Sequence, residues 1–443
     1  MASMNPIPEK APPCEGGKFS LAKLALLSLF TGAGIGLVIG CFRMALDFLN
    51  TARTDSIAWA HQWPVLGFVL VCATVALTTA FAAWLVQRSG QPAAGSGIPH
   101  VEAVIEGKLP AAPILLLPIK FIGGLSAIGG GLALGREGPS VQIGANLAEF
   151  WGKIFRLSGT DRIALFAAGS GAGLSVAFNA PMAGAIFVLE ELVRRFDTRI
   201  AIAALGTSCS AIAVASLMLG QEPDFKVATL PNPSFWTGPI FALLGILAGL
   251  AGVAYNRLII RTCALFDGMT RWRPELRALF IGALVGAIAW FGPHLVGGGD
   301  IISQKALVGG IGLSALPLII AVRLVLGPLS YAAGTPGGLF APILALGACI
   351  GLGFGLLCPQ FVADSGATPI TFVIAGMAAF LTATVRAPIT GMILIFEMTG
   401  AFNQAVPMLW ASFAAMTVPT LMGNSPIYDS MKARTIGVAK TMQ

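Results

Sequence analysis

The chain has 443 residues, of which 56% are hydrophobic and only 11% are charged. Soluble domains carry about 25% charged residues, so this composition excludes an ordinary soluble protein. Four long segments, 200–221, 227–256, 278–299 and 365–385, contain no charged residue. Each is long enough for the ~20 residues that a helix needs to cross a bilayer core. None shows the polar stripe of a helix on the surface of a soluble protein. The sequence therefore predicts an all-α polytopic membrane protein.

The net charge of +7 raises the question of nucleic-acid binding. The basic residues, however, lie at the ends of apolar segments, among them Arg194, Arg195, Lys432, Arg434 and Lys440. This distribution is typical of loops that face the cytoplasm. We therefore expect no nucleic-acid partner, and a location in the cell (inner) membrane with both termini in the cytoplasm.

The first apolar segment, 24–42, is too long for the core of a signal peptide and leads into further apolar segments, so we expect no cleaved leader. The seven cysteines show no CxxC spacing and no histidine cluster, so we expect neither a disulfide framework nor a metal site, and no cofactor. An intramembrane enzyme is the alternative from another class of protein. Against it, the sequence has no HExxH motif, and the glycine-rich segment 169–173 lacks the GK[ST] of a phosphate-binding loop.

Two blocks of sequence occur twice. Residues 120–152 match residues 323–355: in both copies 19 residues separate a basic residue from a proline, and 13 more lead to a glycine. Residues 168–190 match residues 375–397, with 21 residues between a glycine and a glutamate in both copies. Agreement at this many glycine, proline and charged positions indicates two homologous halves.

We therefore expect a first membrane repeat over 20–220, an extramembrane linker over 221–234 and a second membrane repeat over 235–428. Cytoplasmic segments are expected at 1–19 and 429–443. Paired repeats are typical of secondary transporters, in which the substrate lies near the membrane midplane at the repeat interface. The repeats alone leave open whether they are parallel or inverted.

The apolar segments are interrupted unusually often. The chain contains 55 glycines and 28 prolines, and the uncharged segment 324–363 is broken at Gly327-Pro328, at 334–338 and at Pro342. Such residues are tolerated at membrane depth where the freed backbone groups bind elsewhere or line a polar cavity. We expect discontinuous, tilted and half-length helices.

Three motifs place a glycine four residues before a proline: GSGIP at 95–99, GREGP at 135–139 and GLFAP at 338–342. Proline is favoured at the first position of a helix, and glycine lets the preceding loop approach a ligand closely. Helix N-termini carry free N–H groups and a partial positive charge, so three that converge form an anion site. A site of partial charges can bind an anion and still release it. The alternative is close helix packing by small residues.

These motifs resemble the signature loops of the CLC family of chloride channels and chloride/proton antiporters. GSGIP, GREGP and GGLFAP occur in the order of that family, as do Asn179-Ala-Pro181 before Glu190 and Pro426-Ile-Tyr428 near the C-terminus. The resemblance covers nearly the whole chain. It implies two inverted helical repeats that meet at a midplane anion site, and a homodimer in the lipid bilayer with one pore per subunit. It also implies a bacterial-type member without cytoplasmic nucleotide-binding domains.

The resemblance also implies the chloride-binding residues. The hydroxyls of Ser96 and Tyr428 would donate to chloride, Leu339 and Phe340 would contribute backbone amides, and Gly138 would belong to the same site. For Ser96 the alternative is a helix cap, which is compatible with chloride binding because the hydroxyl keeps one donor. For Tyr428 the alternative is a residue of the interfacial aromatic belt.

Glu137 is the main candidate for a gate. A carboxylate at membrane depth is costly and indicates function. At a helix N-terminus it mimics an anion, so it can occupy the chloride position when ionised and leave when protonated, acting as gate and external proton carrier. The alternative is a stabilising acid paired with Arg136. The second repeat has Phe340 at this position, so the fold does not require an acid there.

Glu191 is the candidate for the internal proton site. Glu190 has a counterpart in Glu397, whereas Glu191 aligns with Met398, so only Glu191 breaks the repeat pattern. The resemblance implies that a glutamate at this position passes protons to and from the inside. The alternative is a surface acid that reaches into solvent.

With Ser96, Glu137, Glu191 and Tyr428 present, the sequence predicts a secondary active chloride/proton antiporter with a glutamate gate. The alternative is a passive, proton-gated chloride channel, although channel members usually lack the inner glutamate. Fluoride exchangers depart from these loops, and nitrate-preferring members carry proline in place of the serine. The sequence leaves open the roles of four further residues: Lys120, Arg323, Arg386 and Glu102.

Overall fold

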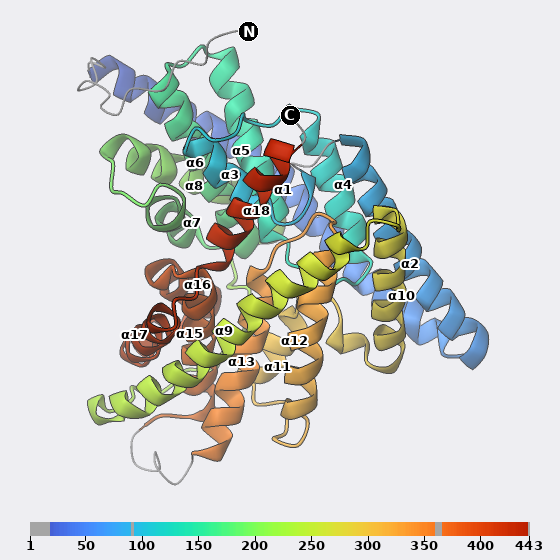
Figure 1. The fold of residues 1–443 in the computed structure, drawn as a ribbon. Coiled ribbons are helices and arrows are strands. Elements are labelled where there is room, and N and C mark those ends of the chain that lie inside the picture. Colours follow the sequence, from blue (N-terminus) through green and yellow to red (C-terminus); the bar gives the residue numbers. More distant parts are fainter. Residues whose placement is uncertain (1–17, 90–92, 359–365, 442–443) are drawn as a thin grey trace.

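A computed structural model describes residues 18–89, 93–358 and 366–441, so most of the expected N-terminal segment 1–19 lies outside the described residues. The described chain is all-helical, apart from loops and two isolated backbone bridges (Figure 1). Six of the described helices are long and apolar enough to cross a membrane. The predicted all-α polytopic fold is confirmed.

The two halves of the chain contain the same order of helices. The first half consists of α1 (Lys18–Ala60), α2 (Pro64–Ser89), α3 (Ile98–Ile105), α4 (Leu116–Gly129), α5 (Glu137–Ile154), α6 (Gly159–Phe178), α7 (Pro181–Phe187), the π-helical turn η2 (Val188–Leu192) and α8 (Thr198–Leu219). The second half consists of η3 (Phe235–Thr237), α9 (Gly238–Gly268), α10 (Pro274–Phe291), η4 (Pro293–Leu295), α11 (Asp300–Leu307), α12 (Leu316–Ala332), α13 (Phe340–Leu357), α15 (Pro369–Val385), α16 (Pro388–Thr399), η5 (Phe402–Gln404) and α17 (Ala405–Leu421). The last helix, α18 (Ile427–Thr441), follows the second half.

Equivalent helices pack on equivalent partners in the two halves. Helix α5 packs on α6 as α13 packs on α15, and α1 packs on α8 as α9 packs on α17. Helices α5 and α13 extend from the middle of the molecule toward opposite ends (Figure 1). The repeats are therefore inverted, which the sequence pattern alone left open.

Several helices are too short to cross a bilayer, as the glycines and prolines predicted. Helices α3 and α11 have eight residues each and α7 has seven, against the ~20 that a full span needs. The uncharged segment 324–363 is divided between α12 and α13 by the loop 333–339. Helix α15 has only 17 residues, fewer than the segment 365–385 suggested, because Thr368 caps it at Pro369.

A two-fold axis relates the halves where the loops before α5 and α13 meet. Gly135 donates its amide to the carbonyl of Gly338 at 2.9 Å, and Gly338 donates to Gly135 at 2.8 Å. The two glycines hold equivalent positions in the repeats, so each contacts its own counterpart. Such reciprocal contact is what a two-fold axis generates.

The repeated glutamates are joined in the same reciprocal way. The Glu190 carboxylate accepts from the amides of Ile389 and Thr390 at the start of α16, at 3.0 and 2.6 Å. The Glu397 carboxylate accepts from Met182 and Ala183 at the start of α7, at 3.0 and 2.8 Å. Each half thus supplies the acid that caps a helix of the other half.

The two buried cations that the sequence left unexplained fix equivalent loops. Lys120 is fully buried and donates to the carbonyls of Ala93 and Gly95, just before α3, at 2.9 and 2.8 Å. Arg323 is equally buried and donates to the carbonyls of Leu295, Gly297 and Gly298, just before α11. Both cations satisfy backbone groups of loops that enter a short helix. Arg386 ends α15 in a left-handed conformation with φ +74°, as the equivalent Asn179 ends α6 with φ +51°.

The reciprocal caps predict matched losses of stability. Glu397→Ala removes the acceptor of two amides at the start of α7 and should cost about 1 kcal/mol, which lowers the thermal midpoint of the purified protein. Glu190→Ala should lower it at least as much, because Glu190 binds two equivalent amides and also the hydroxyl of Thr390. Glu222→Ala, at a side chain that is 81% exposed, is the control. An unchanged midpoint in both cap variants would contradict the assigned role.

Candidate functional site

The three glycine–proline motifs lie side by side. A Cβ atom added at Gly138 would lie 2.7 Å from the backbone of Ser96 and 2.9 Å from Cα of Gly338. Gly95 also pairs with the loop before α13 through backbone hydrogen bonds to Thr335 and Gly337, both at 3.1 Å. The N-termini of α3, α5 and α13 therefore meet, and glycine at 138 allows the three backbones to approach this closely.

Glu137 lies at this meeting point and is fully buried. Its Oε1 accepts a hydrogen bond of 2.6 Å from the amide of Phe340, the first residue of α13. Its Oε2 has no hydrogen-bond partner in the described part of the chain. The carboxylate of one repeat thus takes the place of an anion at a helix N-terminus of the other.

The alternative that Glu137 pairs with Arg136 is not supported. The Arg136 guanidinium instead lies 2.9 Å from Asp224 of the linker and 3.5 Å from Asp47 of α1. Its Nε donates to the carbonyl of Ala177 at 2.8 Å. Arg43 binds the other oxygen of Asp224 at 2.8 Å. The cation next to Glu137 in the sequence is therefore neutralised by the linker, a role of Asp224 that no sequence motif indicated.

Ser96 and Tyr428 both present a hydroxyl within the buried region. The Ser96 Oγ accepts from the amide of Ile98 at 3.1 Å, so it caps the start of α3 and keeps its own hydrogen to donate. Tyr428, at the start of α18, is fully buried, and its hydroxyl has no partner among the described residues. A buried phenol without a partner is costly, which favours a ligand-binding role over an interfacial one.

Aromatic rings surround the first residue of α13. The ring of Tyr428 stacks on Phe340 at 6.0 Å, and Phe178 and Phe187 contact Phe340 at 6.2 and 6.1 Å. Leu339, which precedes the helix, is also fully buried. Sequence reasoning missed Phe178 and Phe187, whose only signal was their proximity to the Asn179-Ala-Pro181 motif. These rings keep the amides at this end of α13 away from bulk water.

Glu191 lies apart from this cluster, in the π-helical turn η2. It is 3% exposed, so it is not a surface acid that reaches into solvent. Its Oε1 lies 3.5 Å from Nη2 of Arg194. Glu191 and its neighbour Glu190 line a cavity of about 640 Å³, together with Arg194 and Arg386. Charged side chains line part of this cavity next to the buried carboxylate, and apolar ones such as Ile186, Leu189 and Phe196 line the rest.

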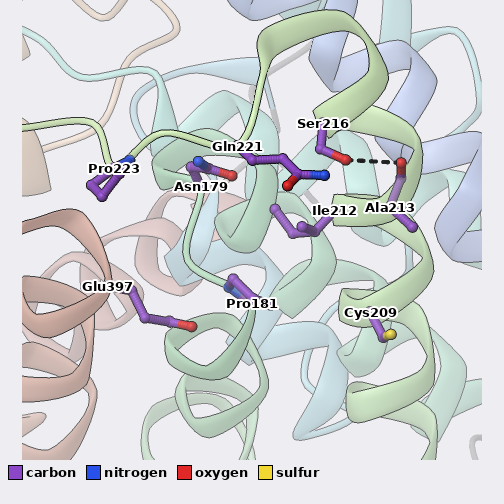
Figure 2. Close-up of a pocket in the computed structure, with 9 residues that line it drawn as sticks. All are labelled: Asn179, Pro181, Cys209, Ile212, Ala213, Ser216, Gln221, Pro223 and Glu397. Atoms are coloured by element: carbon purple, nitrogen blue, oxygen red, sulfur yellow. Dashed lines mark hydrogen bonds between the residues drawn. The ribbon is translucent and has the colours of Figure 1, made fainter. Parts of the chain in front are cut away.

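A second cavity, of about 390 Å³, lies between the start of α7, helix α8 and the beginning of the linker (Figure 2). Figure 2 shows Glu397 beside Pro181 on one side and Cys209 and Ser216 of α8 on the other. The Glu397 carboxylate already binds the amides of α7. The cavity contains none of the expected site residues.

Comparison with known proteins identifies the family. The sequence profile described as voltage gated chloride channel matches residues 78–420. The chain belongs to this family. It is 37% identical to the H(+)/Cl(-) exchange transporter ClcA of Vibrio cholerae over 427 residues, which cover 94% of this chain and 90% of that protein. ClcA of Yersinia pestis is 36% identical over 425 residues, covering 94% and 89%.

Solved structures support the same assignment. The crystal structure of a slow cyanobacterial Cl−/H+ antiporter matches this chain with a TM-score of 0.86 and 29% sequence identity. The match covers 94% of this chain and 98% of that one. Together with the apolar helices, this identifies a multi-pass membrane protein of the CLC type.

The position of the Glu137 carboxylate between Gly135 and Gly338 can be tested by a double-mutant cycle. A Cβ atom added at Gly135 would collide with the Glu137 carboxylate and would approach its Cδ to 2.6 Å, with no other residue among its three nearest atoms. Because the atoms it meets are the end of a side chain that can shift, Gly135→Ala should destabilise the protein by about 1 kcal/mol and much less in a Glu137→Ala background. Thermal unfolding of the four proteins measures the coupling. Equal losses in both backgrounds would contradict the observed position of the carboxylate.

Proposed function

We propose that this protein is a secondary active chloride/proton antiporter in which Glu137 is the gate. The observation that carries the proposal is the hydrogen bond from the Phe340 amide to the Glu137 carboxylate, because it places a titratable acid in an anion position. The names of the relatives, which are exchange transporters, support transport and favour exchange over passive conduction. The substrates are chloride and protons.

The chloride site consists of groups that meet around the start of α13. The hydroxyls of Ser96 and Tyr428 and the amides of Leu339 and Phe340 donate to chloride, and Gly138 belongs to the site because it lets the three loops meet there. Ionised Glu137 competes with chloride for the same amide. A proton on Glu137 removes its charge and weakens its attraction to the helix N-terminus, so the side chain leaves and chloride enters. One residue then gates chloride and carries the proton.

Glu191 serves the proton on the other side of the membrane. Its burial beside a cavity that has charged side chains in its lining allows it to take up a proton without lying on the chloride route. Chloride passes Ser96 and Tyr428, whereas protons move between the cavity, Glu191 and Glu137. Both carboxylates are needed for exchange, and only Glu137 is needed to gate chloride.

A passive, proton-gated chloride channel is the second candidate. It requires Glu137 as a gate but gives Glu191 no task. The burial of Glu191 therefore favours the antiporter, since a buried acid is costly to keep without a function. Flux measurements with both ions separate the two candidates.

The protein is proposed to lie in the cell (inner) membrane with both termini in the cytoplasm. Basic residues gather at the end of the molecule where Glu191 lies. They include Arg194, Arg195, Lys432 and Arg434, and such an excess of Lys and Arg is typical of the cytoplasmic side. The family resemblance further suggests a homodimer in the lipid bilayer, with a pore in each subunit. The linker 221–234 then lies on the external side, where Asp224 neutralises Arg136 next to the gate.

Removing the Glu137 carboxylate tests the gate. Glu137→Ala should conduct chloride at a rate that no longer rises as external pH falls, and should move no protons, because nothing titratable competes with the ion. Chloride efflux and proton uptake are measured together in liposomes. A Glu137→Ala protein that still exchanges protons for chloride would refute the mechanism.

Neutralising Glu191 tests the inner proton site separately. Glu191→Gln should leave chloride flux within about two-fold of the unmodified protein but abolish proton movement driven by chloride, because the chloride ligands are untouched. Glu222→Gln, at an exposed acid, is the control and should retain both fluxes. Normal proton movement in Glu191→Gln would show that the inner half of the path lies elsewhere.

A further inference from the structure

Arg194 contacts two acids from different parts of the chain. Its guanidinium makes two hydrogen bonds to Asp429 of α18, at 2.9 and 3.1 Å. The same Nη2 lies 3.5 Å from the Glu191 carboxylate, and Nε donates to the Glu191 carbonyl at 3.1 Å. Arg194 thus bridges η2 and α18.

Asp429 is shared with a second cation. Lys432 lies 3.2 Å from the same Asp429 oxygen that binds Nη2 of Arg194. It also lies 3.1 Å from Glu102, which is 1% exposed, and 2.7 Å from Glu106. We call the six residues of this cluster the inner network; its members are Glu102, Glu106, Glu191, Arg194, Asp429 and Lys432.

The inner network contains more acid than base. Its four carboxylates face two cations, and a third cation, Lys108, pairs with Glu106 at the exposed edge. Glu191 also follows another acid, Glu190, in the sequence. Among the cations of the inner network, Arg194 is the one that contacts the Glu191 carboxylate directly. A proton on Glu191 therefore changes the charge that holds Arg194 between its two acids.

The position of Asp429 gives this link a consequence for chloride. Asp429 directly follows Tyr428 at the start of α18, and Tyr428 stacks on Phe340 at the chloride site. Arg194 itself has a left-handed backbone with φ +54°, an uncommon conformation for a residue with a side chain. Such a conformation persists where the surrounding contacts determine it.

We propose that Arg194 is a positioning residue that joins the protonation of Glu191 to the position of Tyr428. When Glu191 is ionised, both acids attract Arg194, and α18 is held against η2 with Tyr428 on Phe340. When Glu191 takes up a proton, its carboxyl no longer attracts Arg194, which keeps its bonds to Asp429 and to the Glu191 carbonyl. The guanidinium then shifts toward Asp429, the hold of η2 on α18 weakens, and Tyr428 moves away from the chloride site. The inner barrier to chloride then opens with the arrival of the inner proton.

This inference rests on the roles proposed above for Glu191 and Tyr428. Arg194 is partly exposed, with 43% of its side chain accessible, so the link shifts a population rather than acting as a complete switch. We therefore expect changes of a few-fold when it is broken.

The test compares Arg194→Gln and Asp429→Asn with Arg195→Gln. The control removes the same charge from the next residue, which lines the same cavity but makes no ion pair in the described part of the chain. Currents are recorded in planar bilayers while the pH on the Arg194 side is varied, and the reversal potential gives the number of chloride ions moved per proton. Both test variants should raise that number about two-fold or more and flatten the dependence of chloride flux on this pH. Arg195→Gln should retain the ratio and the pH dependence of the unmodified protein.

Arg194→Lys, which keeps the charge but not the two-pronged geometry, should lie between Arg194→Gln and the unmodified protein. If Asp429→Asn is not recovered as a folded protein, Arg194→Gln at its partly exposed position decides the outcome. A ratio and pH dependence that stay unchanged in Arg194→Gln, or that change equally in Arg195→Gln, would overturn the role of Arg194. If the unmodified protein itself moves no protons with chloride, the proposed function fails instead.

Discussion

The amide of Phe340 donates to the carboxylate of Glu137 in a fully buried position, and the rest of the site depends on this contact. The acid comes from the first repeat and the helix N-terminus from the second. Because the N-terminus attracts any anion, the carboxylate and a free anion have the same preferred position. In the proposed mechanism, a proton removes the negative charge of Glu137 and leaves the position to the free anion. Gly135, Gly138 and Gly338 matter because a larger residue at any of them would collide with this arrangement.

The two-fold relation of the repeats produces that contact. The paired glycines 135 and 338 bring the two loops together, and the reciprocal caps of Glu190 and Glu397 join the halves a second time. Lys120 and Arg323 then fix the loops before α3 and α11. Function arises where the symmetry is broken: Glu137 faces Phe340 across the axis, and Glu191 has no acidic counterpart. The two carboxylates without an acidic counterpart in the other repeat are the ones to which we assign the proton path.

The repeats, the short helices and the candidate acids could be predicted from the sequence, because glycine and proline recur at positions where the backbone conformation requires them. Glycine and proline at fixed spacing predicted the short helices, and the comparison of halves separated Glu191 from Glu190. The contacts of charged side chains could not be predicted, since they depend on which distant segments meet. Arg136 pairs with Asp224 of the linker rather than with Glu137, and Arg194 reaches Asp429 across more than two hundred positions. Likewise, no spacing showed that Lys120 and Arg323 bind loop carbonyls.

The most direct test of exchange uses the unmodified protein in liposomes loaded with chloride and diluted into low chloride. The membrane voltage is held at zero with a potassium ionophore and equal potassium on both sides. Chloride leaving the liposomes should drive protons inward against an opposing pH gradient. Chloride efflux that leaves the internal pH unchanged would contradict the account and would identify a passive chloride channel.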